Sequence, residues 1–236
     1  MAIQAVNPAL AGKKGAKKGS KKKVTETFTK KDWIDLKLPN TFVTRVAGKA
    51  LVTRSLGKQN VEQDLVGKMF CVNQSDLCPD NEENSFRKFK FVIDSVKGKD
   101  AISTFNGMEI TSDKHKGIIR KWHTLIEGYL DIKTKDNFYL RVFMIAVTKR
   151  RSDSLKKTSY AHSSQVRQIR KIMFEVIKEE IEDCDISKII KKLMNEKIGK
   201  EVEKRSGVII PIQNCHVRKV KVIKRIKSAE EEIEEE

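Results

Sequence analysis

The chain has 236 residues and a formal net charge of +17 at pH 7, with 34% charged and only 6% aromatic residues. The charged tails do not explain this excess, because the seven Lys of residues 1–23 and the six Glu of residues 230–236 nearly cancel. A body this basic indicates a polyanionic partner, with nucleic acid favoured over an anionic membrane surface, and no stretch approaches the roughly 20 apolar residues of a membrane span.

Both ends of the chain are predicted to be disordered tails around one folded unit. Residues 1–23 include GKKGAKKGSKKK, which has nothing apolar to bury. This segment is either a nuclear localisation signal or an arm that threads between phosphates, and both can hold. Residues 228–236 form an acidic tail. The predicted organisation is a basic arm (1–23), a single domain (24–227) and an acidic tail (228–236).

Residues 24–39 combine basic and apolar side chains and are expected to lie along the body of the domain. Lys30 and Lys31 precede Trp33, and Pro39 ends the segment. Trp33 could stack on a base, but a Trp among aliphatic residues is more often a core anchor. We therefore expect Trp33 to be buried.

From Phe42 to about Val147 the dominant hydrophobic period is two, which predicts strands. A hairpin is expected at Gly98-Lys99, and a short helix over 112–121. Trp122, Ile126, Leu130 and Ile132 are expected to face inward, and Lys135-Asp136-Asn137 supplies a turn. The strand 138–148 is apolar on both faces and should be central. Many short strands with polar turns predict a closed or nearly closed antiparallel barrel.

The stretch 148–171 is dense in Lys and Arg, with Asp153 as its one acid. Like charges this close repel, so the stretch indicates an anionic partner such as a phosphate backbone. After Ser163 and Ser164, apolar residues recur at helical spacing to about Asp185. An amphipathic helix is predicted there.

The charge order in this helix opposes its dipole. Arg167, Arg170 and Lys171 lie near the positive N-terminal end, and Glu179, Glu180, Glu182 and Asp183 lie near the other end. An external anion at the N-terminal end would remove the penalty. The alternative is a solvated face in which Lys171 pairs with Glu175 at i,i+4. We expect the acidic end to be dispensable for assembly.

Two shorter helices are predicted over 186–194 and 198–205, followed by extended segments over 208–212 and 215–223 that could return to the sheet. The predicted fold class is α+β: an antiparallel β-barrel with helices packed on one side and disordered charged tails.

The sequence shows no signature of a catalytic or metal site. Cys71, Cys78, Cys184 and Cys215 form no CxxC pair, and the four His do not complete a zinc spacing. We expect reduced thiols, no metal, no cofactor and no enzymatic activity. Glu127 and Asp131 share one face of a strand, but Arg141 offers a simple cross-strand partner.

Several segments together resemble a known family. KKDWIDLKLP (30–39), LVTR (51–54), FRKFKF (86–91), FNGM (105–108) and above all KTSYAHSSQVRQIRK (157–171) are similar to the ribosomal protein S-three-a family, also called eukaryotic S-one. The similarity continues through IGKEVEK (198–204) and VRKVKVIK (217–224). His162 and Ile172 depart from the family pattern.

The resemblance implies a structural constituent of the small (40S) ribosomal subunit, on the platform near the messenger exit channel. Implied partners are the 3′ region of small-subunit rRNA, neighbouring platform proteins, mRNA near the exit channel and initiation factors. No membrane and no homo-oligomer are expected, and the implied location is the cytoplasm, with nuclear and nucleolar transit during assembly. The alternative is a free-standing RNA-binding translation factor.

The candidate RNA-binding residues are the basic side chains of these segments and one aromatic residue. They are Lys30, Lys31, Arg54, Arg87, Lys88, Lys90, Lys149, Arg150, Arg151, Lys156, Lys157, Tyr160, Arg167, Arg170, Lys171, Arg218, Lys219 and Lys221.

Overall fold

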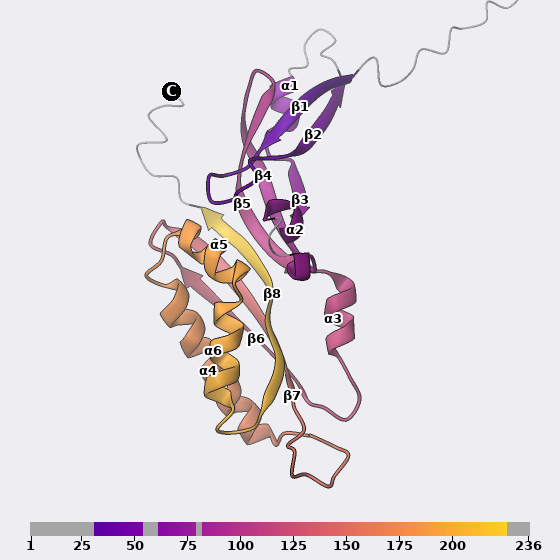
Figure 1. Ribbon diagram of the computed structural model, residues 1–236. Coiled ribbons are helices and arrows are strands. Elements are labelled where there is room, and N and C mark those ends of the chain that lie inside the picture. The colour runs from indigo at the N-terminus through magenta and orange to yellow at the C-terminus, as the bar shows by residue number, and fades with distance from the viewer. Residues whose placement is uncertain (1–30, 54–60, 79–81, 226–236) are drawn as a thin grey trace, which may run out of the picture.

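A computed structural model describes residues 31–53, 61–78 and 82–225 (Figure 1). The predicted arm (1–23) and acidic tail (228–236) lie outside these residues, as do Lys30 and Arg54. The strands are β1 (Lys31–Lys37), β2 (Val46–Thr53), β3 (Met69–Asn73), β4 (Arg87–Lys97), β5 (Asp100–Ile110), β6 (Leu125–Lys133), β7 (Phe138–Thr148) and β8 (Ile212–Arg225). The helices are α1 (Val61–Leu65), α2 (Gln74–Leu77), the 3₁₀ helix η2 (Glu82–Asn84), α3 (Ser112–Ile118), α4 (Ser163–Ile181), α5 (Ile186–Met194) and α6 (Lys197–Ser206).

Strand β5 joins the two parts of one eight-stranded sheet. One of its edges pairs with β4 along most of its length. Its other edge is shared, because β1 runs parallel to its beginning and β8 runs antiparallel to its end. The sheet therefore forks, with β1 and β2 in one arm and β8, β7 and β6 in the other (Figure 1).

The α+β class is confirmed, but the predicted closed antiparallel barrel is not. The row of paired strands ends at β2 and β6, and no pairing joins these two strands in the described parts of the chain. The contact between β1 and β5 is parallel rather than antiparallel. Because β1 and β8 share one edge of β5, the two arms diverge instead of closing on each other.

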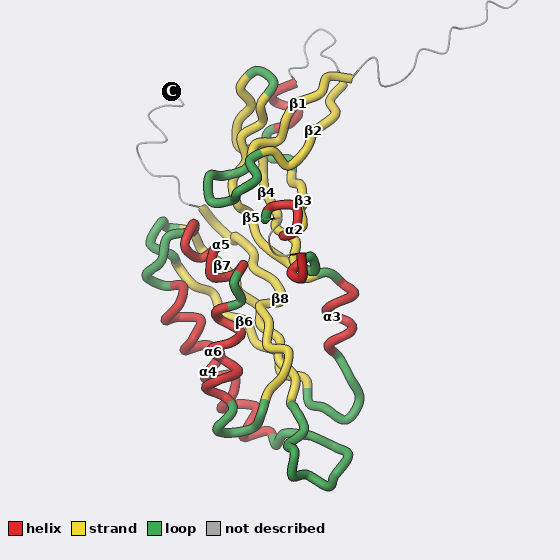
Figure 2. The backbone as a smooth tube through the Cα atoms, viewed as in Figure 1, coloured by secondary structure: helices red, strands yellow, loops and turns green. Residues whose placement is uncertain are grey.

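The larger arm packs its helices on one face, as predicted. The cross-strand row Leu130, Val142, Val220, Met108 and Phe89 points to this face, and all but Leu130 are fully buried. Figure 2 shows α4, α5 and α6 together along one side of the strands β6, β7 and β8. Residues one position along the strands, such as Lys219 and Lys221, project from the opposite face because side chains alternate.

Several elements agree with the sequence-based predictions. Strand β7 and helix α5 have the predicted bounds, and β4 and β5 form the predicted hairpin. Helix α4 ends at Ile181, a few residues before the predicted end. The segment Val208–Ile210 is not a strand, although Ile212 begins β8.

Both tryptophans are exposed, which contradicts the predictions for their burial. Trp33 is 51% exposed on β1, and Trp122 is 44% exposed before β6. The alternation of β1 explains Trp33, because Ile34 and Leu36 occupy its buried face. Trp122 lies in a connection outside the strand, so the period of β6 does not apply to it.

A buried arginine ties the sheet to the helical layer. Arg87, which is 3% exposed at the start of β4, donates from Nη1 to Gln74 Oε1 (2.7 Å) and to the carbonyl of Met194 (3.0 Å). Its Nη2 bonds to the carboxylate of Glu196, between α5 and α6. Glu196 adopts a left-handed backbone conformation with φ of 56°, which a non-glycine residue seldom adopts without compensation.

The carboxylate of Glu196 is held in its charged form. His216 Nδ1 lies 3.3 Å from Glu196 Oε1, although this atom is not aligned for a hydrogen bond. The adjacent His216 ring and the Arg87 guanidinium hold the pKa of Glu196 at about 2, against an ordinary value of 4.5. Because the folded-state pKa is the lower one, the stabilisation is complete above pH 4.5 and is lost as the pH falls toward 2.

We predict that Glu196→Gln lowers the free energy of unfolding at pH 7 by about 3–5 kcal/mol, because the Arg87 charge stays buried without its counter-charge. The variant should also lose part of the wild-type fall in stability between pH 4.5 and 2. Urea unfolding across this pH range measures both effects.

The matched control is Glu182→Gln, because Glu182 is exposed on the helical layer and makes no ion pair with a described residue. It should change stability by less than about 0.5 kcal/mol. Equal stabilities for the two variants would show that Glu196 does not hold the Arg87 charge.

Candidate RNA interface

One end of the domain collects basic side chains from several segments, and we call it the loop end. It comprises residues 119–124, residues 149–162 and the first turn of α4. Figure 1 shows the connection after β7 projecting past the sheet beside the start of α4.

A network of hydrogen bonds holds the base of this projecting loop. The Thr148 hydroxyl donates to the carbonyl of Ser159 (2.6 Å) and accepts from the Thr124 amide (2.9 Å). The Ala161 amide donates to the Thr124 hydroxyl (2.9 Å), and the Ser159 amide donates to the carbonyl of Trp122 (2.8 Å). The loop therefore starts and ends at fixed positions.

The basic side chains of the loop point into solvent without internal counter-charges. Lys149, Arg150, Arg151, Lys156 and Lys157 are all exposed. Among the described residues, none of the five forms an ion pair with a carboxylate. The two guanidinium groups bond only to carbonyl oxygens, which leaves their charge uncompensated.

A polar cleft of about 230 Å³ opens between the loop and α4. Lys149, Arg151, Tyr160, His162 and Gln165 contribute to its lining. The cleft therefore joins two cations and the exposed Tyr160 to the N-terminal end of a helix, whose free N–H groups favour anions.

The three basic residues predicted on α4 differ in their surroundings. Arg167 is exposed and makes no ion pair with a described residue. Arg170 donates from Nε to the carbonyl of Glu127 (2.9 Å), so it also anchors α4 to β6. Lys171 lies 3.9 Å from Glu175, which is the i,i+4 contact expected of a solvated face. Of the three, Arg167 therefore has the fewest polar contacts within the protein.

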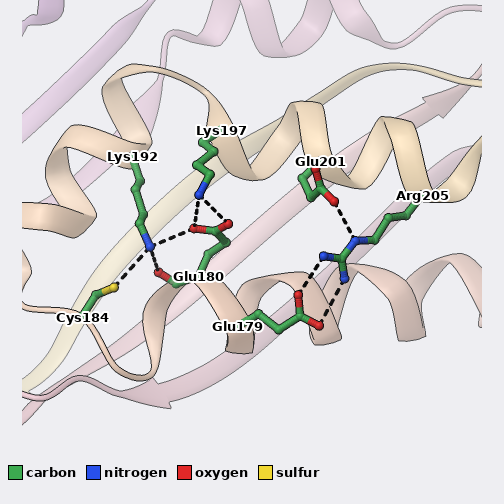
Figure 3. Close-up of polar contacts among 7 residues, drawn as sticks. All are labelled: Glu179, Glu180, Cys184, Lys192, Lys197, Glu201 and Arg205. Carbon is green, nitrogen blue, oxygen red and sulfur yellow. Dashed lines mark hydrogen bonds and ion pairs between the residues drawn. The ribbon is translucent and has the colours of Figure 1, made fainter.

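The acidic end of α4 is neutralised from within the protein (Figure 3). Glu180 pairs with Lys192 (2.8 Å) and Lys197 (2.9 Å), and Glu179 pairs with Arg205 (2.8 Å). Burial raises the pKa of Glu180, but the two lysines outweigh burial and lower it. These pairs join α4 to α5 and α6, so this end of the helix has a role in the fold, and the expectation that it is dispensable for assembly stays a prediction.

Four predicted lysines lie on the sheet face opposite the helices. The register places Lys88 and Lys219 on either side of Glu109. Lys90 and Lys221 lie on either side of Gly107, two residues away on each strand. Glu109 pairs with Lys90 (2.6 Å) and Lys219 (3.5 Å), so part of this charge is compensated.

The remaining predicted residues are partly or fully engaged within the protein. Arg218 pairs with Glu127 (3.3 Å), and Lys31 donates to the Thr53 hydroxyl (2.6 Å). Arg87 is buried and cannot reach RNA, which corrects its assignment as a candidate contact. The alternation in FRKFKF could have predicted the burial of Arg87, because Arg87 lies on the same strand face as the core residue Phe89.

The charge distribution of the described residues is typical of a nucleic-acid-binding protein. They form a basic α+β domain with uncompensated cations gathered at one end, as in proteins that bind nucleic acid. They bring together no group of three His, Cys, Asp or Glu that could hold a metal ion. No helix in the described ranges is long and apolar enough to cross a membrane.

The comparison with protein families identifies the chain more closely. Residues 19–226 match the Ribosomal S3Ae family, and the chain belongs to this family. It is therefore a small-subunit ribosomal protein, associated with the ribosome in the cytoplasm and acting with rRNA and other ribosomal proteins. This match confirms the resemblance found in the sequence.

We predict that Glu180→Gln lowers the free energy of unfolding by about 1.5–3 kcal/mol, because two lysines lose their charged acceptor. Glu182→Gln, on the same helix, should be close to neutral because Glu182 is exposed and unpaired among the described residues. Thermal melting of the two free proteins compares them, and equal melting temperatures would contradict a structural role for the acidic end.

Proposed function

We propose that the protein is a structural constituent of the small ribosomal subunit that binds rRNA phosphates through its loop end. The observation that carries this proposal is the contrast between the two ends of α4. Glu179 and Glu180 form ion pairs within the protein, whereas Arg167 and the cations of the preceding loop form no ion pair with a described residue. An external polyanion would supply the missing counter-charge.

The geometry favours contact with the RNA backbone and its shape over reading of base edges. Flexible lysines and arginines in a projecting loop suit phosphates along an irregular surface. The N-terminal end of α4 adds helix-dipole attraction beside Arg151 and Lys149. The partly compensated lysines opposite the helices, including Lys88 and Lys221, form a second, weaker basic surface.

The location within the subunit is proposed from the family resemblance. The resemblance favours a position on the platform near the mRNA exit channel, in contact with the 3′ region of the rRNA. The proposed partners there are neighbouring platform proteins, mRNA and initiation factors. The resemblance also favours transit through the nucleolus during assembly and a role without catalysis. Lys30 and Arg54 remain proposed contacts outside the described residues.

We predict that changing Lys149, Arg150 and Arg151 together to Ala reduces the steepness of log K against log salt concentration by roughly 2 to 3, because three phosphate contacts are lost. The melting temperature of the free protein should stay unchanged, since these side chains are exposed. Filter binding to an rRNA fragment at several salt concentrations measures the slope.

The control removes the same charge at the other end of the domain, with Lys68, Lys97 and Lys99 changed to Ala. All three are exposed, and none forms an ion pair with a described residue. This variant should keep the salt slope and should sediment with small subunits at high salt. If both variants lose the same amount of salt slope, the loop end is not the interface. If the wild-type protein dissociates from the small subunit at high salt, the protein is a free-standing factor.

A second prediction tests the location of the loop end. Leu155 is fully exposed at the tip of the loop, so Leu155→Cys can carry a tethered iron chelate, with the exposed Cys71 changed to Ser. Hydroxyl radicals released there should cleave the 3′ region of small-subunit rRNA. Cleavage confined to another rRNA region would refute the proposed location.

A further inference from the structure

Trp122 is a large aromatic side chain kept in solvent beside the basic loop. It is 44% exposed, while core aromatics such as Phe89 and Phe91 are fully buried. Its φ of 71° lies in the left-handed region, which is strained for a bulky side chain. The residue therefore gains little of the packing that a core Trp obtains, and it adopts an unfavourable backbone conformation.

The strain at Trp122 is maintained by the loop. Its carbonyl accepts the Ser159 amide at 2.8 Å, and a bridge pairs His123 with Ser159. These contacts fix the backbone of Trp122 relative to the end of the basic loop. Glycine would satisfy the same backbone geometry without strain, because the contacts are made by main-chain atoms.

The surroundings of the Trp122 ring are cationic. Lys157 Nζ lies 5.0 Å from the ring centroid, and the exposed Arg120 and Lys121 come directly before Trp122. A flat ring with one cation over it, in a segment that carries two more, matches the arrangement in which a base stacks while neighbouring phosphates take the charges. A docked protein fits less well, because the centres of protein interfaces are depleted in lysine.

We propose that Trp122 stacks on an unpaired nucleobase of the RNA bound at the loop end. This inference rests on the proposed function and makes it more specific, since bases inside a duplex already stack on each other and cannot cover the ring. The loop cations hold the backbone, and Trp122 selects RNA that presents a free base. When a phosphate draws Lys157 away, the ring face that its ammonium covers becomes available.

Fluorescence provides a direct test, because the chain has only two tryptophans. In a full-length Trp33→Phe protein, Trp122 is the only indole. Single-stranded oligoadenylate should quench its emission on binding, whereas an RNA duplex of equal length and inorganic polyphosphate should bind with little quenching. Equal quenching by all three probes would overturn stacking.

Binding by variants at position 122 supplies the second readout. Trp122→Gly should weaken binding of the single strand by roughly 5- to 150-fold, as expected for loss of one stacked base, and leave duplex binding unchanged. Its melting temperature should be equal to or above that of the wild type, because the backbone strain is removed. Trp122→Phe keeps a ring and should retain part of the single-strand affinity.

The outcomes separate this inference from the proposed function. If the wild type binds no RNA in a salt-dependent manner, the proposed function fails. If it binds RNA but Trp122→Gly leaves single-strand affinity unchanged, the stacking inference alone fails. Impaired entry into the small subunit with unchanged RNA affinity would assign Trp122 to a protein neighbour and would also overturn the inference.

Discussion

The buried charge of Arg87 constrains how the sheet and the helical layer fit together. A guanidinium with only 3% exposure needs a counter-charge and acceptors, and these come from Gln74, Met194 and Glu196. The start of α6 is therefore fixed relative to β4. Gly199 then allows α6 to approach β8 closely, because a Cβ at this position would collide with the carbonyl oxygen of Cys215.

The position of α6 determines how the charges of α4 are compensated. In this position of α6, Lys197 pairs with Glu180 and Arg205 pairs with Glu179. Lys192 of α5 also pairs with Glu180. Glu179 and Glu180 at the acidic end of α4 are thus paired within the fold. No comparable partner reaches Arg167 from the described residues, so the reversed charge order of α4 is resolved at one end only.

Local patterns in the sequence predicted much of the fold, and long-range pairing explains most of the errors. The bounds of β7 and α5 follow from their hydrophobic pattern and turn residues. The forked sheet does not, because alternation along β5 does not reveal that β1 and β8 share its edge. For the candidate site, the basic loop was visible as charge density. Trp122 was predicted to face inward because it shares the period of Ile126 and Ile132, but it precedes β6, where this period does not apply.

Three departures from locally favourable structure meet at the loop end. A free protein would be more stable with an acidic residue in the first turn of α4, with counter-charges for the loop cations, and with glycine in place of Trp122. None of these is present, whereas at the acidic end of α4 Glu179 and Glu180 both have partners. Local departures that lack compensation within a chain are expected where a partner supplies it. A phosphate backbone with an unpaired base compensates all three together, since it brings negative charge to α4 and the loop and covers the ring of Trp122.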